Sequence, residues 1–168
     1  MQENDTNAFV YDIYILTYGG LPLYGGCTGS AFCQQHPGQH ALHCGFFAAM
    51  KSFCQEAFGQ YQVYLIEMDD ISVHLMTDPA TEVMLAGVYP RMVPEQEARE
   101  QLETMMGRFT EKYAQNLAAG AVCDESIFDS FTEDLVELGI IPNADVKCSI
   151  PLQFAEGSQK VNMPALPA

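Results

Sequence analysis

The sequence has 168 residues, 48% of them hydrophobic and 17% charged, which is enough to bury a core of its own. Its 22 acidic and 7 basic residues give a formal charge of −15, which disfavours binding to nucleic-acid phosphates or anionic membranes. No apolar run reaches the roughly 20 residues that span a bilayer, and the polar start MQENDTN lacks a basic signal-peptide region. We therefore expect a cytoplasmic protein without a transmembrane segment. A basic partner surface would complement the charge, although acidity that serves solubility alone is the simpler explanation.

The residues from Val10 to Tyr24, VYDIYILTYGGLPLY, predict a β-hairpin around which the rest of the chain is organised. β-Branched and aromatic side chains favour strands, and Gly19-Gly20 can adopt the positive φ that a tight turn requires. Because Pro22 has no N–H group, its strand is expected at an edge of the sheet. A loop over residues 25–39, rich in Gly, Gln and Ser, should follow.

A change of period then predicts a helix over about His40 to Phe58, which Gly59 is placed to end. Its apolar stripe consists of Phe46, Phe47, Met50, Phe53, Cys54 and Ala57. Beyond it, three strands with short turns predict an antiparallel meander. These are Tyr61–Glu67, Ile71–Met76 and Glu82–Tyr89, with turns at Asp69-Asp70 and Asp78-Pro79.

The longest predicted helix opens at Pro94 and closes at Gly120. Its apolar face consists of Leu102, Met105, Met106, Phe109, Tyr113 and Leu117. A shorter helix should run from about Glu125 to Leu138, and the pattern from Val146 to Leu152 allows a further edge strand. We expect one domain over residues 1–152, of which 1–8 form a flexible lead-in, and a flexible tail over residues 153–168.

The order β-β-α-β-β-β-α-α resembles the longin-like members of the longin/roadblock superfamily, which have a profilin-like fold. The matching pieces are IYILTYGGLPLYG, GFFAAMKSFCQEAFG, YLIEMDDISVHLM, REQLETMMGRFTEKYAQNL and SIFDSFTEDLVELG, which cover most of residues 10–139. Roadblock domains in the narrow sense begin with a helix, whereas this chain begins with strands, so longin is the closer resemblance.

This resemblance implies an α+β fold with a five-stranded antiparallel sheet, one helix on one face and two on the other. It also implies a non-enzymatic adaptor or scaffold without a cofactor. The expected partner is a Ras-like small GTPase or another longin/roadblock subunit, in trafficking or polarity-type regulation, and a homodimer is compatible with it.

The densest group of chemically versatile residues lies between positions 27 and 44. It consists of Cys27, Cys33, His36, His40, His43 and Cys44. Thiolates and imidazoles are the ligands that zinc prefers, so a metal-binding module is the alternative function. The spacing C-x5-C-x2-H-x3-H-x2-H-C lacks a tight C-x2-C pair, and a flexible polar loop with Cys44 packed at a helix end is the favoured interpretation. We assign no metal ligand, cofactor site or catalytic residue.

Two further patterns invite a functional interpretation. Cys44 beside His43 at a helix start could act as an activated thiol, which makes a thiol enzyme the weaker alternative. The string GGCTGS has glycines but no lysine, so it does not predict a phosphate-binding loop.

The last predicted helix is strongly acidic. Its acids are Asp124, Glu125, Asp129, Glu133, Asp134 and Glu137, with no base among them. They form either the solvated face of an amphipathic helix, which is the favoured interpretation, or a docking face for a basic partner.

Overall fold

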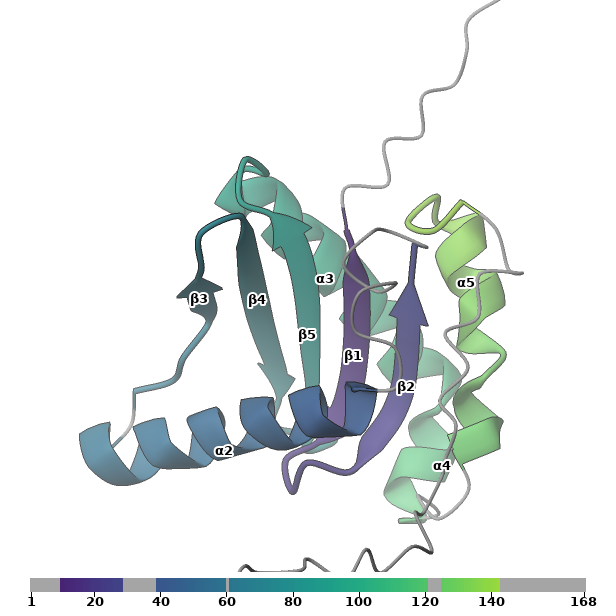
Figure 1. Ribbon diagram of the computed structural model, residues 1–168. Helices are drawn as coiled ribbons and strands as arrows, with labels where there is room; N and C mark the ends of the chain where they lie inside the picture. The colour runs from purple at the N-terminus through teal and green to yellow at the C-terminus, as the bar shows by residue number, and fades with distance from the viewer. Residues whose placement is uncertain (1–9, 29–38, 60, 121–124, 143–168) are drawn as a thin grey trace, which may run out of the picture.

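The predicted hairpin forms, and its first strand lies inside an antiparallel sheet (Figure 1). The computed structural model describes residues 10–28, 39–59, 61–120 and 125–142. Gly20 has a φ of +88°, a conformation that glycine adopts without strain, and its N–H donates to the carbonyl of Thr17. The turn therefore closes as the sequence predicts.

Over the described residues the sheet has five strands in the order β2-β1-β5-β4-β3, and each neighbouring pair is antiparallel. The strands are β1 (Asp12–Thr17), β2 (Pro22–Cys27), β3 (Leu65–Glu67), β4 (Ile71–Asp78) and β5 (Val83–Pro90). β2 lies at one edge, as Pro22 predicts, and β3 lies at the other. The strands from β3 to β5 form the expected meander.

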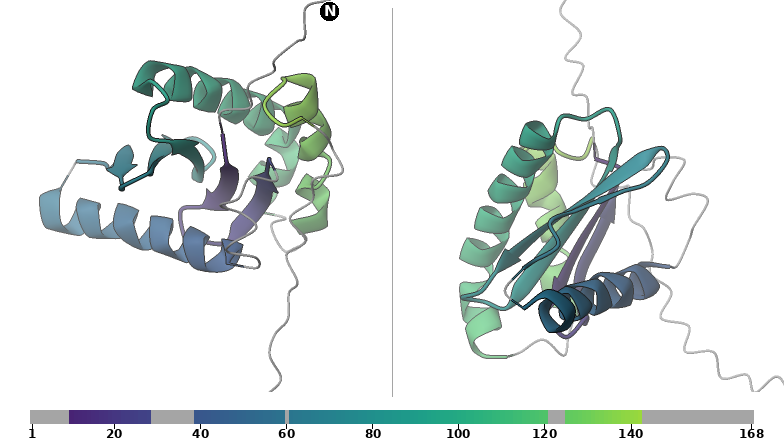
Figure 2. Two further views of the ribbon diagram at one scale, coloured as in Figure 1. Left: turned by 45° about the horizontal axis from the view of Figure 1, so that its top comes forward. Right: turned by 90° about the vertical axis from the view of Figure 1, so that its left-hand side faces the viewer.

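Helices cover both faces of this sheet (Figures 1 and 2). They are α2 (His40–Phe58), α3 (Glu95–Lys112), α4 (Ala114–Ala118), a 3-10 turn η1 (Glu125–Phe128) and α5 (Phe131–Glu137). One face is covered by α2, and the opposite face by α3 and α5. The α+β fold class predicted from the sequence is confirmed.

Alternation along β1 separates two hydrophobic cores, because successive side chains of a strand point to opposite faces. Ile13 and Ile15 belong to the core under α3 and α5, whereas Tyr14 and Leu16 belong to the core under α2. The larger core closes around Phe109, which contacts aromatic rings of η1 and α5. This packing fixes the last helices on the sheet.

The prediction of a loop over residues 25–39 is wrong for its first residues, because β2 continues to Cys27. Gly25 pairs with Tyr14 in the sheet, and the ring of His40 packs directly on its backbone. A Cβ atom at Gly25 would lie 2.8 Å from His40 Nδ1. Glycine therefore marks a close approach between a strand and a helix here, and not a loop.

Three element boundaries also differ from prediction. β3 is shorter than expected and begins at Leu65. The longest helix breaks at Tyr113, after which α4 continues for five residues. The predicted helix from Glu125 to Leu138 is divided into η1 and α5.

Several predicted features lie outside the described residues. They are the lead-in over 1–8, Cys33 and His36, Asp124, the strand from Val146 to Leu152, and the tail over 153–168. Within the described part of the chain, no helix is both long and apolar enough to cross a membrane.

Candidate functional site

An apolar stripe on α2 faces away from the sheet. Leu42, Phe46 and Phe53 are 70%, 43% and 59% exposed, and Met50 between them is half-buried. At 3.6 residues per turn these four residues lie along one line, which we call the α2 outer stripe. The sequence predicts Phe46 and Phe53 as part of an apolar face, and the structure places that part in solvent.

A different side of α2 contacts the sheet. It consists of His40, Cys44, Phe47, Ala48 and Lys51. The ammonium of Lys51 lies 3.8 Å from the centre of the Tyr18 ring and donates a hydrogen bond to Gln55. Since Lys51 and Glu56 are the only fully charged side chains of α2, the helix has no net charge. Its outer stripe is thus a neutral, apolar surface on a strongly acidic protein.

Among the described strands, β3 is the last in the sheet and has no neighbour on its outer side. The carbonyl of Tyr64 accepts a bond from the N–H of Leu75, and the N–H of Met68 donates to the carbonyl of Ile71. Alternate residues of a strand direct their backbone groups to the same side, so Leu65 and Glu67 direct theirs away from β4. An edge of this kind can accept an additional strand.

A pocket of about 350 Å³ lies at this edge, between the sheet and α3. Its lining includes Gln62, Tyr64, His74, Met76, Glu95 and Arg99. Buried His74 shares a 3.2 Å hydrogen bond with Ser72 and packs edge-on against Tyr89. Burial lowers the pKa of His74 below its ordinary value, while the nearby carboxylates of Glu95 and Glu67 act to raise it. The pocket therefore combines a desolvated imidazole with an acidic rim.

A second polar cluster lies beneath the start of α2. The hydroxyl of Tyr14 is 3.1 Å from Asp12 Oδ2, to which it donates, and 2.8 Å from His43 Nδ1. The ring of His40 packs edge-on against Tyr14. Burial lowers the pKa of His40, and the neighbouring His43 lowers it further. This network anchors the helix start to the first strand.

The predicted Cys/His group is only partly brought together. Cys33 and His36 lie outside the described residues, so the full set is untested. Among the residues that the structure describes, no three His, Cys, Asp or Glu side chains are placed to hold a metal. Cys27 and Cys44 are buried thiols, with Cys44 only 1% exposed. His43 binds the hydroxyl of Tyr14, and burial of Cys44 keeps its sulfur out of reach of a substrate, whereas a reactive thiol is at least partly exposed.

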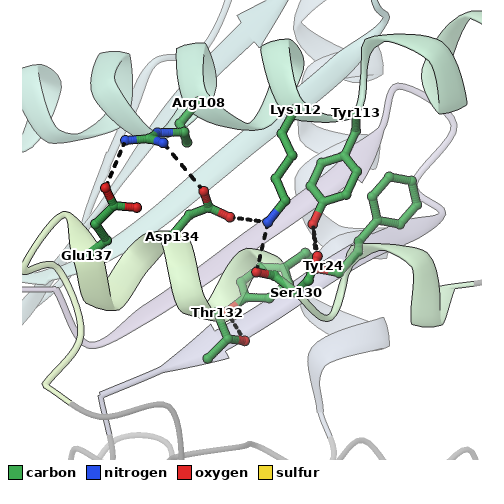
Figure 3. Close-up of polar contacts among 9 residues, drawn as sticks. Tyr24, Arg108, Lys112, Tyr113, Ser130, Thr132, Asp134 and Glu137 are labelled. Carbon is green, nitrogen blue, oxygen red and sulfur yellow. Dashed lines mark hydrogen bonds and ion pairs between the residues drawn. The ribbon is translucent and has the colours of Figure 1, made fainter.

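The acidic segment over residues 124–137 is only partly exposed to solvent (Figure 3). Asp134 is buried, contacts Lys112 through Oδ2 and lies 3.7 Å from Arg108 Nη1 through Oδ1. Glu137 lies 3.9 Å from the other terminal nitrogen of Arg108. Desolvation acts to lower the pKa of Lys112, but Asp134 raises it above its ordinary value. Asp134 therefore holds α5 against α3. Among the acids of this segment whose burial the structure describes, Asp129, Glu133 and Glu137 are exposed.

Comparisons with known proteins identify the fold. No protein-family model and no curated protein matches this sequence. Among solved structures, a Roadblock/LC7 domain from Streptomyces avermitilis matches with a TM-score of 0.50 and 14% identity, over 64% of this chain and 87% of that one. MglB from Myxococcus xanthus matches with a TM-score of 0.47 and 12% identity, over 68% of this chain and 94% of that one. The similarity to the Roadblock/LC7 domain agrees with the strand order and helix placement described above, and the chain has a longin/roadblock-type fold.

Proposed function

We propose that the chain is a non-enzymatic cytoplasmic adaptor that binds another longin/roadblock-type subunit or a Ras-like small GTPase, in trafficking or polarity-type regulation. The observation that carries this proposal is the α2 outer stripe. Contiguous exposed apolar side chains on a protein surface mark interaction sites, and aromatic residues such as Phe46 and Phe53 are favoured there.

We infer that the α2 outer stripe binds a second copy of the chain. Two copies with 15 excess negative charges each repel one another over most of their surfaces. On α2 this repulsion is weakest, because the helix has no net charge and Lys51 is directed inward against Tyr18. A two-fold axis across α2 would bring the same stripe of both copies together, as a self-complementary interface requires.

Light scattering after gel filtration, over a dilution series, tests this proposal. The wild-type chain should have the mass of a dimer, and the double variant Phe46→Asp/Phe53→Asp the mass of a monomer. Met92→Asp is the matched control, since Met92 is 87% exposed and lies outside α2. A monomeric wild type, or a dimer that both variants leave intact, would contradict the proposal.

The GTPase part of the proposal requires a direct binding measurement. A Ras-like GTPase encoded near the gene, loaded with GTP or with GDP, would be titrated into the chain by calorimetry. Binding that depends on the nucleotide supports the regulatory role, whereas absence of binding in both states removes the GTPase from the proposal.

A further inference from the structure

The pocket between the sheet and α3 has a preformed inner wall. Leu102 and His74, which are 2% and 5% exposed, are among the most buried residues that line it. The ring of His74 is held in place, because Nε2 shares a hydrogen bond with Ser72 and the ring packs edge-on against Tyr89. Ligand pockets have volumes of about 300–1,000 Å³ and are largely formed before the ligand binds. At about 350 Å³, this pocket is large enough for a ligand of the size of an amino acid.

The inner wall of the pocket suits an apolar group. Met76 and Leu102 contribute apolar side chains to it. Burial lowers the pKa of His74 below its ordinary value, against the opposing effect of Glu95 and Glu67, so its imidazole is uncharged at neutral pH. A hydrocarbon group that enters the pocket therefore leaves no buried charge without a partner on this wall.

Two opposite charges lie at the mouth of the same pocket. Glu95 and Arg99 both line it, and both are exposed. Because they are four residues apart on α3, they lie about 6 Å from one another along the helix axis. Among the described residues no ion pair joins them, and Arg99 instead contacts Glu103 through Nε at 3.1 Å. The terminal nitrogens of the Arg99 guanidinium and the Glu95 carboxylate are thus available to a ligand.

We propose that this pocket binds a free α-amino acid with an apolar side chain. The ammonium group of the ligand pairs with Glu95, and its carboxylate pairs with Arg99, whose guanidinium can donate two parallel hydrogen bonds to a carboxylate. The side chain of the ligand enters the pocket and packs against Leu102, Met76 and His74. The inference goes beyond the proposed adaptor function and does not depend on it.

The charge of the protein favours a zwitterion over other charged ligands. With a formal charge of −15, the protein repels anions. A ligand with only a positive charge would pair with Glu95 but would also meet the guanidinium of Arg99, and like charges disfavour binding. An amino acid has no net charge and offers one group of each sign, as the mouth of the pocket does.

The probes are L-phenylalanine and L-leucine, titrated into the ¹⁵N-labelled full chain and followed in ¹H–¹⁵N spectra. A dissociation constant of about 1 mM or lower is expected for ligands of this size, with shifts of the His74 and Arg99 amides. N-Acetyl-L-phenylalanine lacks the ammonium group, L-phenylalanine amide lacks the carboxylate, and glycine lacks the side chain. Each should bind at least about tenfold more weakly than L-phenylalanine. The proposal is wrong if neither probe binds, if any of the three comparison compounds binds equally well, or if the shifts are confined to other parts of the chain.

Two variants with matched controls test the charged contacts. Glu95→Gln and Arg99→Gln should each weaken the binding of L-phenylalanine at least about fivefold, because each removes one charge from the mouth of the pocket. Glu111→Gln, about 24 Å from Glu95 along α3, and Arg91→Gln, outside the pocket, should each change it less than about twofold. All four positions are exposed, and circular dichroism checks that the variants are folded. A variant that binds as well as its control would overturn the proposal.

The competing occupant of the pocket is a side chain from a second copy of the chain, because the pocket lies beside the edge strand β3. Titration of L-phenylalanine into the wild type and into Phe46→Asp/Phe53→Asp, at one protein concentration, separates the two occupants. The proposal expects affinities that agree within about twofold, whatever the oligomeric state of either protein. Binding that appears only in a monomeric variant would show that a second copy fills the pocket, and an amino acid would then not be its occupant.

Discussion

Lys112 and Asp134 join the last turn of α3 to α5, and Arg108 approaches the same carboxylate from the preceding turn (Figure 3). Two cations four residues apart on a helix repel one another, and a buried carboxylate between them offsets that repulsion. Lys112 also donates to the carbonyl of Ser130, next to the start of α5. The contact therefore holds the helix that closes the larger core.

Asp134→Asn should destabilise the protein by about 1–3 kcal/mol, because it leaves Lys112 and Arg108 without their common partner. Urea unfolding followed by circular dichroism measures this change. Glu133→Gln is the matched control, since it removes one negative charge from an exposed position of the same helix. Equal losses in the two variants would show that helix charge, and not the contact with Lys112, determines the effect.

Gly25→Ala tests the close contact between β2 and α2. The new methyl group would meet His40, which is buried and cannot move away freely, so a loss of about 1–3 kcal/mol is expected. Replacing His40 by alanine should remove the clash between its ring and the new methyl group at position 25. In a double-mutant cycle, Gly25→Ala should therefore cost less in the His40→Ala background than in the wild type. Additive effects would contradict the assigned contact.

The sheet could be predicted from the sequence because its signals are local. Alternating apolar residues around Ile13 and Val73, with glycine and proline at the turns, specify strands without knowledge of their neighbours. The sequence predicts a loop at Gly25 because glycine has low strand propensity. Glycine is needed in this strand because the ring of His40 packs against it, a contact that only the tertiary structure creates.

The candidate surfaces were harder to predict for the same physical reason. Periodicity identifies Phe46 and Phe53 as apolar positions of a helix, but it cannot say which part of an apolar arc the sheet covers. The role of Asp134 depends on Lys112, 22 residues earlier in the chain. The open edge of β3 depends on strand order, which no single stretch of sequence encodes.

The thiols provide a test of the weaker alternative functions. Cys44 is 1% exposed, whereas Cys54 is half-buried, so a thiol reagent should modify Cys54 faster in the native protein. Mass spectrometry of digested, partly labelled protein assigns the order. Preferential labelling of Cys44, at a rate above that of a free model thiol, would revive the thiol-enzyme hypothesis.

Metal analysis tests the remaining alternative, which includes Cys33 and His36. Protein purified without a histidine tag should contain far less than one equivalent of zinc. The measurement is decisive because a structural zinc site stays close to fully occupied through purification. One equivalent of zinc that Cys33→Ser/His36→Ala removes would establish the metal-binding module. The paired variant Cys54→Ser should leave any bound metal unchanged.

Tyr24 makes stability depend on pH in the alkaline range. Burial is the main cause that raises the pKa of Tyr24 from 10.0 to about 12, against the opposing effect of its 2.9 Å hydrogen bond with Thr132. Because the folded state holds the phenol proton more tightly than the unfolded state, this contribution is complete below pH 10. It is lost as the pH rises from 10 towards 12, and the loss amounts to about 2–3 kcal/mol.

Urea unfolding from pH 8 to 12 measures this loss, and Tyr24→Phe should flatten the decline by removing one ionisable phenol. Tyr61→Phe is the matched control, because Tyr61 is 76% exposed and its substitution should leave the profile unchanged. Absorbance at the phenolate wavelength provides a second readout, in which the Tyr24 variant lacks one of the late-titrating tyrosines. If both variants follow the wild-type profile, ionisation of Tyr24 does not cause the loss of stability above pH 10. The contact between β2 and α5 then contributes to stability through packing alone.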